Sequence, residues 1–208
     1  MAALTPEGFA AAAGVSRETL ARLEAYAALL GRWQGAVSLV GRGTLDDLWR
    51  RHMLDSAQLA AHLPHGAEIL TDLGSGAGFP GLVLAIVAGL RVHLVEATGR
   101  KAAFLREAAR LTGANAEVHQ ARIESLRPWE TDAVTARALA PLPALLGYAR
   151  PFLETSAPRR PVCLFLKGAA GKRELTEARK TWTMTAETFP SLSDDAGMIL
   201  KLGDVTKT

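Results

Sequence analysis

The sequence predicts an α/β protein built around a mostly parallel β-sheet. From residue 68 onward, short apolar runs alternate with helix-like stretches, which is the pattern of βαβ units joined by right-handed crossovers. A glycine-rich loop follows the first of these apolar runs. Of the 208 residues, 49% are hydrophobic, which is enough to bury a sizeable core.

The region before the first strand is predicted to form a small helical cap. Ser16 is the expected N-cap of a helix whose apolar residues recur on one stripe at helical spacing. A second helix is predicted to begin at Thr44, because Thr44 and Asp47 have the spacing of a capping box. We therefore expect a cap over residues 1–66 and a Rossmann-like core over residues 67–208.

The core elements are predicted in order along the chain. The expected strands are Ile69–Leu73, Val92–Glu96, Ala116–His119, Ala133–Ala136 and Val162–Lys167. The helices between them are expected near Gly81–Ala88, Lys101–Leu111 and Pro143–Phe152. Beyond these, a helix near Lys172–Lys180 and a weaker strand pair, about Thr181–Thr188 and Met198–Leu202, would extend one edge of the sheet.

The most informative segment is the glycine loop after the first strand, with the sequence Gly-Ala-Gly-Phe-Pro-Gly over residues 76–81. It matches G-x-G-x-x-G, and Glu96 follows Gly76 by 20 residues, at the end of the next strand, as a dinucleotide site requires. One alternative is therefore an NAD-dependent oxidoreductase. Asp72 opposes it, because a carboxylate just before the glycines would repel a pyrophosphate.

A cationic nucleoside cofactor fits this loop better than a dinucleotide does. S-adenosylmethionine carries a sulfonium and an ammonium group but no phosphate, so the carboxylate of Asp72 would attract it. Gly74, Gly76 and Gly78 would let the backbone approach the cofactor, and Glu96 would accept hydrogen bonds from the ribose hydroxyls. The residues themselves thus favour S-adenosylmethionine as the cofactor.

A family resemblance supports this interpretation. The segment Asp72–Gly81, together with Arg-His-Met-Leu-Asp-Ser over residues 51–56, resembles the bacterial RsmG (GidB) family of 16S rRNA guanine-N7 methyltransferases. The resemblance extends roughly from Trp33 to Gly168. It implies a class I S-adenosylmethionine-dependent methyltransferase fold with a small N-terminal helical cap.

The family's pattern also implies roles for individual residues. It places Gly74 and Phe79 at the cofactor, Ile123 and Glu124 at the adenine, and Arg137 at the mouth of the active site. The predicted cofactor-binding residues are Asp72, Gly74, Ser75, Gly76, Gly78, Phe79, Glu96, Ile123, Glu124 and Arg137.

The substrate residues are expected at the carboxyl ends of the strands. Guanine N7 has a free lone pair at neutral pH, so proximity and orientation should provide most of the catalysis, without a general base. Arg137, the predicted catalytic residue, and Lys167 suit the O6 side of guanine and the phosphates. Arg100, Lys101 and His52 are further candidates for binding the substrate, and His52 is expected to pair with Asp55 on the second helix.

Composition limits the remaining possibilities. A single cysteine, Cys163, excludes a disulfide framework and a cysteine metal cluster, and it is predicted to lie in the core. His62 and His65 flank a turn while His93 and His119 fall in different strands, so no metal site is expected. The sequence has no targeting or membrane-spanning run, which predicts a cytoplasmic protein.

The partner is expected to be 16S rRNA within the small ribosomal subunit. The net charge of +3 is a mild basic excess, so the shape of a ribonucleoprotein would have to contribute to recognition by a monomeric enzyme. Two alternatives remain open besides the oxidoreductase: a methyltransferase acting on another RNA or a small molecule, and a catalytically silent RNA-binding module.

Overall fold

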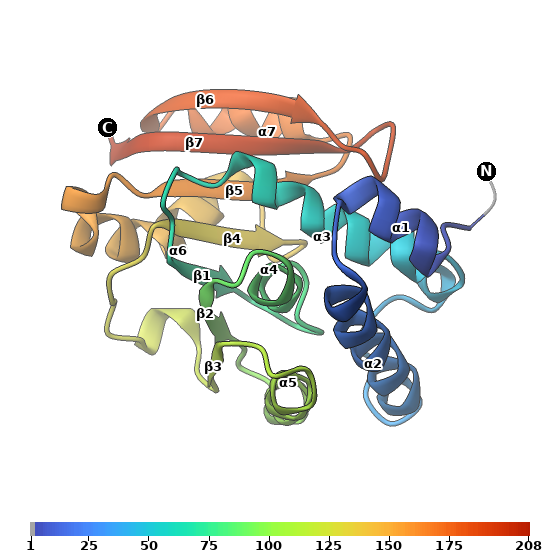
Figure 1. Cartoon of the computed structure of the whole chain (residues 1–208). Coiled ribbons are helices and arrows are strands. Elements are labelled where there is room, and N and C mark those ends of the chain that lie inside the picture. Colours follow the sequence, from blue (N-terminus) through green and yellow to red (C-terminus); the bar gives the residue numbers. More distant parts are fainter. Residues whose placement is uncertain (1–2) are drawn as a thin grey trace.

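The computed structural model describes residues 3–208, which fold around one seven-stranded sheet with the strand order β3-β2-β1-β4-β5-β7-β6 (Figure 1). The first five strands are mutually parallel, whereas β7 is antiparallel to both β5 and β6. The strands are β1 (Ile69–Leu73), β2 (Arg91–Val95), β3 (Ala116–His119), β4 (Ala133–Arg137), β5 (Val162–Lys167), β6 (Trp182–Pro190) and β7 (Met198–Lys207).

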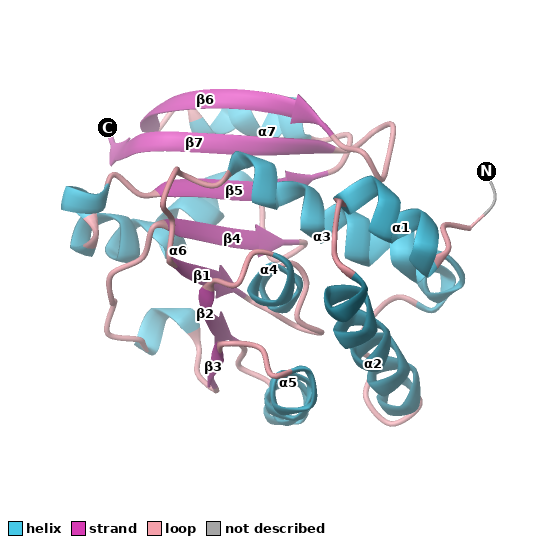
Figure 2. Cartoon of the chain, viewed as in Figure 1, coloured by secondary structure: helices cyan, strands magenta, loops and turns pink. Residues whose placement is uncertain are grey.

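Helices cover both faces of the sheet (Figure 2). On one face, α4 and α5 share a hydrophobic core with α1 and α2, and on the other face α6 and α7 share a second core. The helices are α1 (Pro6–Ala13), α2 (Arg17–Gln34), α3 (Asp55–Ala57), α4 (Gly81–Val87), α5 (Gly99–Thr112), α6 (Leu142–Thr155) and α7 (Gly171–Ala178). The predicted α/β fold with a mostly parallel sheet is confirmed.

Four of the five parallel strands, β1, β2, β4 and β5, were predictable because most of their residues are buried and form short apolar runs. Three have the predicted bounds, namely β1, β3 and β5. Strand β2 begins and ends one residue earlier than predicted, and β4 ends one residue later. The two C-terminal strands are longer than predicted, because they pair with each other along most of their length. The single cysteine, Cys163, is fully buried in β5, as predicted.

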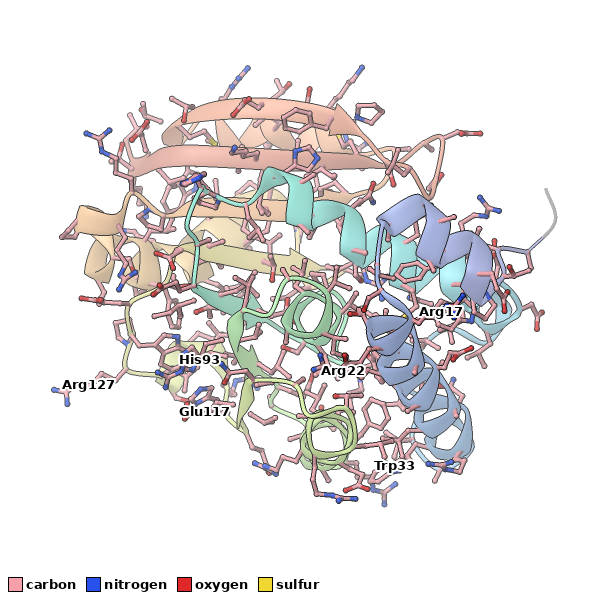
Figure 3. All side chains as sticks on the ribbon, viewed as in Figure 1. Arg17, Arg22, Trp33, His93, Glu117 and Arg127 are labelled. Carbon is pink, nitrogen blue, oxygen red and sulfur yellow. The ribbon has the colours of Figure 1, made fainter. Side chains whose placement is uncertain are left out.

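The N-terminal helices pack onto the sheet layer. As predicted, Ser16 caps α2, and its hydroxyl accepts a hydrogen bond from the amide of Thr19 at 3.1 Å. Trp33 at the end of α2 lies edge-on against Phe104 of α5, with the ring centroids 5.7 Å apart (Figure 3). Residues 1–66 therefore share a continuous core with the sheet rather than enclosing a core of their own.

The prediction of one continuous α-helix beginning at Thr44 is wrong. The chain from residue 42 to 62 is a 3₁₀ helix, a π-helix, the short α3 and another 3₁₀ helix in succession. The predicted capping box does not form, because the Thr44 hydroxyl donates to the carbonyl of Gly41 and the Asp47 carboxylate accepts from the amide of Leu4. The prediction also missed α1, although Thr5 and Gly14 cap its two ends.

The sheet topology also brings two histidines together. His93 and His119 lie in different strands, as predicted, but β2 and β3 are neighbours, so the argument that this excludes a shared site does not hold. Nδ1 of His93 lies 2.9 Å from Nε2 of His119. Figure 3 shows His93 beside Glu117. Among the described residues, no helix has both the length and the apolar character needed to cross a membrane.

Candidate functional site

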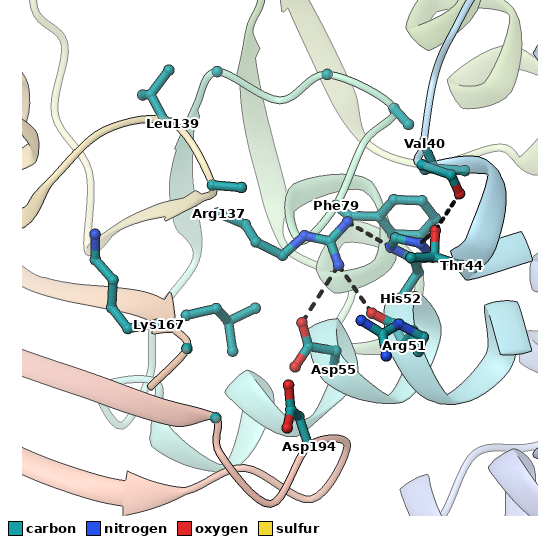
Figure 4. Close-up of a pocket in the computed structure, with 18 of the residues that line it drawn as sticks. Val40, Thr44, Arg51, His52, Asp55, Phe79, Arg137, Leu139, Lys167 and Asp194 are labelled. Carbon is teal, nitrogen blue, oxygen red and sulfur yellow. Dashed lines mark hydrogen bonds and ion pairs between the residues drawn. The ribbon is translucent and has the colours of Figure 1, made fainter. Parts of the chain in front are cut away.

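A cleft lies at the carboxyl ends of the parallel strands, where open α/β sheets bind their ligands. It has a volume of about 790 Å³ and adjoins a second hollow of about 340 Å³ (Figure 4). The two share part of their lining, so they form the two ends of one site. The residues that line both hollows are Gly74, Gly76, Lys101, Arg137, Ala138 and Leu139.

The glycine loop is held against the cap by a tyrosine of α2. The buried hydroxyl of Tyr26 donates a hydrogen bond to the carbonyl of Ala77, in the middle of the loop. Gly78 next to it has φ +96°, and a Cβ there would lie 2.7 Å from the Tyr26 oxygen and 3.0 Å from Cβ of Leu82. Only glycine fits this position, because both the backbone conformation and the close packing exclude a side chain.

Glu96 directly follows β2, and its carboxylate lies at the glycine loop, 20 residues along the chain from Gly76. One carboxylate oxygen accepts a hydrogen bond from the amide of Gly76 at 3.0 Å, and the other accepts from the amide of Thr98 at 2.7 Å. A carboxylate has about four acceptor positions, so each oxygen can still accept one hydroxyl. The smaller hollow also includes Ile123 and Glu124, the two residues that the family's pattern assigns to the adenine.

Asp72 is the clearest correction to the predicted cofactor contacts. Its side chain is fully buried beneath the loop and lines neither end of the cleft. One carboxylate oxygen accepts from the hydroxyl of Thr135 at 2.8 Å, and the other accepts from the amide of Gly81 at 3.3 Å. The first amide of α4 is thus already paired with a carboxylate, which leaves it unsuited to a pyrophosphate.

The burial of Asp72 makes the stability of the protein depend on pH. Burial raises its pKa from 3.8 to about 6, despite the opposing hydrogen bonds of Thr135 and Gly81. Between these two pKa values, Asp72 is protonated in the folded protein but ionised in the unfolded chain. The free energy of unfolding therefore falls as the pH rises through about 6. We expect the stability of the wild type relative to Asp72→Asn to fall by about 1–2 kcal/mol between pH 5 and pH 7.5. Urea unfolding of both proteins at the two pH values measures this, and a difference that is the same at both would contradict it.

Arg137 at the end of β4 joins the sheet to the cap at the mouth of the cleft (Figure 4). Its Nη2 donates to Nδ1 of His52 at 2.7 Å, and its Nη1 donates to the carbonyl of Arg51 at 3.1 Å and to the carboxylate of Asp55 at 3.4 Å. The guanidinium also lies 5.0 Å from the centre of the Phe79 ring. These contacts give Arg137 one orientation, with a side chain that is 19% exposed.

His52 is uncharged and connects Arg137 to Thr44 through its two ring nitrogens. Burial and the charges of Arg137 and Arg51 lower its pKa to about 3, so the ring is uncharged at neutral pH. Because Nδ1 accepts from Arg137, the proton lies on Nε2 and points to the Thr44 hydroxyl at 2.8 Å. The predicted pairing of His52 with Asp55 is replaced by a shared contact, since both residues bind Arg137.

The loop between β6 and β7 closes the far side of the larger hollow, and the sequence analysis missed it. The hydroxyl of Ser193 donates to the carboxylate of Asp55 at 2.5 Å, and the Gln58 side chain accepts from the amide of Leu192 at 2.8 Å. Asp194 lies at the same rim (Figure 4). The partners in each hydrogen bond are more than 130 residues apart in sequence, so no local sequence pattern predicts these contacts.

The predicted basic residues differ in what they contact. Lys101 lines both ends of the cleft, whereas Arg100 is exposed outside the lining. The ammonium of Lys167 is already engaged, because it donates to the carbonyl of Ala140 at 2.9 Å and to the carboxylate of Glu174 at 2.8 Å. Lys167 therefore supports the loop after β4, in addition to lining the larger hollow.

Comparison with known proteins agrees with this geometry. The family model described as rRNA small subunit methyltransferase G (GidB) matches residues 19–196. A relative named ribosomal RNA small subunit methyltransferase G from Rhodospirillum centenum is 57% identical over 197 residues, covering 95% of this chain and 89% of the relative. The relative of the same name from Rhodospirillum rubrum is 56% identical over 202 residues, covering 97% of this chain and 98% of the relative.

Two solved structures share the fold at low sequence identity. An O-methyltransferase from Bacillus cereus, solved in complex with SAH, has a TM-score of 0.58 at 16% identity and covers 87% of this chain and 91% of its own. The glycopeptide N-methyltransferase MtfA, complexed with (S)-adenosyl-L-methionine, has a TM-score of 0.58 at 10% identity, covering 73% of this chain and 93% of its own. The similarity supports the class I methyltransferase fold.

Proposed function

Because the chain belongs to the rRNA small subunit methyltransferase G (GidB) family, we propose that it transfers a methyl group from S-adenosylmethionine to N7 of a guanine in 16S rRNA. The observation that carries the proposal is the two-ended cleft at the carboxyl ends of the strands. The glycine loop and Glu96 lie at one end of it, and the Arg137 network lies at the mouth of the other.

The residues of the smaller hollow fit an adenosine group. Glu96 would bind the ribose hydroxyls, and Ile123 and Glu124 would lie along the adenine. Gly74 and Gly76 would let the backbone approach the amino acid portion where the two hollows meet. The carboxylate of Asp72 at the start of α4 argues against a dinucleotide, because a pyrophosphate would need the amide that it occupies.

The proposed mechanism relies on orientation rather than on proton transfer. S-adenosylmethionine supplies a methyl group on a positively charged sulfur, and the lone pair of guanine N7 is available to attack it at neutral pH. No residue of the chain then has to accept a proton before the transfer. Phe79 and the Arg137–His52 contact would form a rigid wall beside the base, with Arg137 directed to its O6 side.

The wider setting of the substrate is part of the same proposal. We place the enzyme in the cytoplasm as a monomer that acts on the small ribosomal subunit. The charge of +3 is small, so electrostatic attraction to naked RNA would be weak and strongly salt-dependent. A folded ribonucleoprotein would add recognition by shape.

The proposal is tested by transfer of a labelled methyl group from S-adenosylmethionine to small subunits that lack native methylation, with free 16S rRNA in parallel. We expect label in 7-methylguanosine after nucleoside digestion, with the assembled subunit labelled faster than free rRNA. Label in another nucleoside would overturn the N7 assignment. Binding of S-adenosylmethionine without any methyl transfer would be consistent with the methyltransferase fold but would overturn the proposed substrate.

The two lysines of the cleft are expected to respond differently to substitution. None of the described residues forms a hydrogen bond or an ion pair with Lys101, so its charge is available to RNA phosphates. We expect Lys101→Ala to reduce the slope of log affinity against log salt for the small subunit by roughly 1. Lys167→Ala should instead lower the thermal stability and leave the slope unchanged, because it breaks the contacts to Ala140 and Glu174. A reduced slope for Lys167→Ala alone would reverse these assignments.

A further inference from the structure

A cluster outside the cleft has the composition of a metal site. His93 of β2 and Glu117 of β3 are register partners, and both are labelled in Figure 3. His119 lies two residues further along β3, on the same face of the sheet as Glu117. Nδ1 of His93 is 2.9 Å from Nε2 of His119 and 3.6 Å from Oε2 of Glu117, while Nε2 of His119 is 3.7 Å from Oε1 of Glu117. The two ring nitrogens thus face the carboxylate of Glu117, and one ligand atom from each of the three residues lies within 4.8 Å of the other two.

These distances are close to those of a coordination shell. A tetrahedral Zn²⁺ with bonds of about 2.0–2.2 Å to nitrogen and oxygen separates its ligand atoms by about 3.3 Å. The three separations, which use both oxygens of the Glu117 carboxylate, bracket that value. A small rotation of the exposed Glu117 side chain would bring one of its oxygens to the ion that the two ring nitrogens share. Two imidazoles and a carboxylate are ligands that Zn²⁺ accepts, and the set leaves a fourth position for water.

The imidazoles are held in place from behind by Trp129. Its ring stacks on His119 with the centroids 4.3 Å apart and an angle of 22°, and it lies 4.7 Å from the ring of His93. The indole Nε1 donates to the hydroxyl of Thr71 at 2.9 Å, which fixes the tryptophan itself. Both histidine orientations are therefore set before any ion arrives, which lowers the entropy lost on binding.

The charges around the cluster are compatible with a cation. A neutral imidazole offers a metal ion the lone pair of one ring nitrogen, and His93 and His119 each direct one ring nitrogen into the cluster. The guanidinium of Arg91 lies 3.4 Å from Glu117 and competes for its carboxylate. Both of these side chains are 55% exposed at the sheet edge, so Arg91 can move into solvent when an ion replaces it.

We propose that His93, Glu117 and His119 form a binding site for a divalent transition-metal ion, with Zn²⁺ the best match. The ion joins β2 to β3 at the free edge of the sheet. The carbonyl of His119 accepts hydrogen bonds from the amides of Glu96 and Ala121, at 3.0 and 3.1 Å. The site therefore stabilises the edge strand from which the adenine side of the cleft is built.

The site is tested directly with the metal alone. Untagged protein is treated with a chelator, and Zn²⁺ binding is measured by equilibrium dialysis, with Co²⁺ as a spectroscopic probe of tetrahedral coordination. We expect one Zn²⁺ per chain, visible Co²⁺ absorption that Zn²⁺ abolishes, and a rise in the melting temperature on adding Zn²⁺. A wild-type protein without stoichiometric binding overturns the proposal.

Matched substitutions locate the ion. We expect His119→Gln to weaken Zn²⁺ binding at least a hundredfold and Glu117→Gln at least tenfold. The controls are His65→Gln, an exposed histidine in a turn, and Glu107→Gln, which removes a surface carboxylate paired with Arg110. Both controls should bind within twofold of the wild type. Because Glu117 is largely exposed, its variant keeps the fold, and unchanged binding by Glu117→Gln and His119→Gln together overturns the assignment.

Discussion

Replacing Arg137 with alanine is expected to lower kcat/KM for methyl transfer by about a hundredfold, equivalent to about 3 kcal/mol of transition-state stabilisation. The guanidinium holds His52, Asp55 and the carbonyl of Arg51 in one arrangement at the mouth of the cleft. Its loss would remove the group that we propose faces the base and would break the contact between β4 and the cap. Steady-state kinetics on small subunits measure the effect.

The control variants separate the causes of this loss. Arg137→Lys keeps the charge but cannot form the forked contacts, so we expect a loss of about tenfold. Arg150→Ala removes an exposed arginine that pairs with Glu154 outside the cleft, and it should leave kcat/KM unchanged. Because the mechanism needs no proton acceptor, residual turnover should persist in Arg137→Ala. An Arg137→Ala enzyme within threefold of the wild type would refute the orienting role.

Substituting alanine for Gly78 is expected to weaken S-adenosylmethionine binding by at least a hundredfold and to lower the free energy of unfolding by about 2–4 kcal/mol. The new Cβ would have to occupy a backbone position with φ +96° and would lie 2.7 Å from the Tyr26 oxygen. The loop would then shift away from α2, carrying the backbone that faces the cofactor. Calorimetric titration and urea unfolding measure the two quantities.

Two further variants isolate the steric part of the Gly78 effect. Gly89 also has a positive φ, +68°, but a Cβ there meets nothing within 4 Å, so Gly89→Ala should cost only about 1 kcal/mol and leave cofactor binding intact. Tyr26→Phe removes the oxygen that the Gly78 Cβ would meet, at the expense of the hydrogen bond to Ala77. In the double variant we expect the two losses to be less than additive by at least about 1 kcal/mol, and strict additivity would contradict the clash.

The cap shows where prediction from local pattern ends. The helix after Ser16 was predictable, because its cap and its apolar stripe both lie within the segment itself. The segment from residue 42 to 62 was not, since the Asp47 side chain that resembles part of a capping box is used by the amide of Leu4, 43 residues away. A polar side chain has few bonds to make, and a distant partner can take the one that a local rule assigns to it.

Asp72 illustrates the same limit within the site. Its position before the glycines correctly argued against a pyrophosphate, but the carboxylate acts through the amide of Gly81 rather than by facing a ligand. Which way a residue at a strand end points depends on the packing of the next helix, and here α4 lies directly over it.

The sequence by itself determined the parallel sheet, the glycine loop, the position of Glu96 and the family, because alternating apolar runs and contiguous motifs are properties of neighbouring residues. Tertiary structure alone decided the Arg137–His52–Asp55 network, the closure of the cleft by Ser193, and the meeting of His93 with His119. The physical reason is that hydrogen bonds and ligand geometry require approach within about 3 Å. For groups far apart along the chain, only the strand order and the packing of the cap onto the sheet bring them that close.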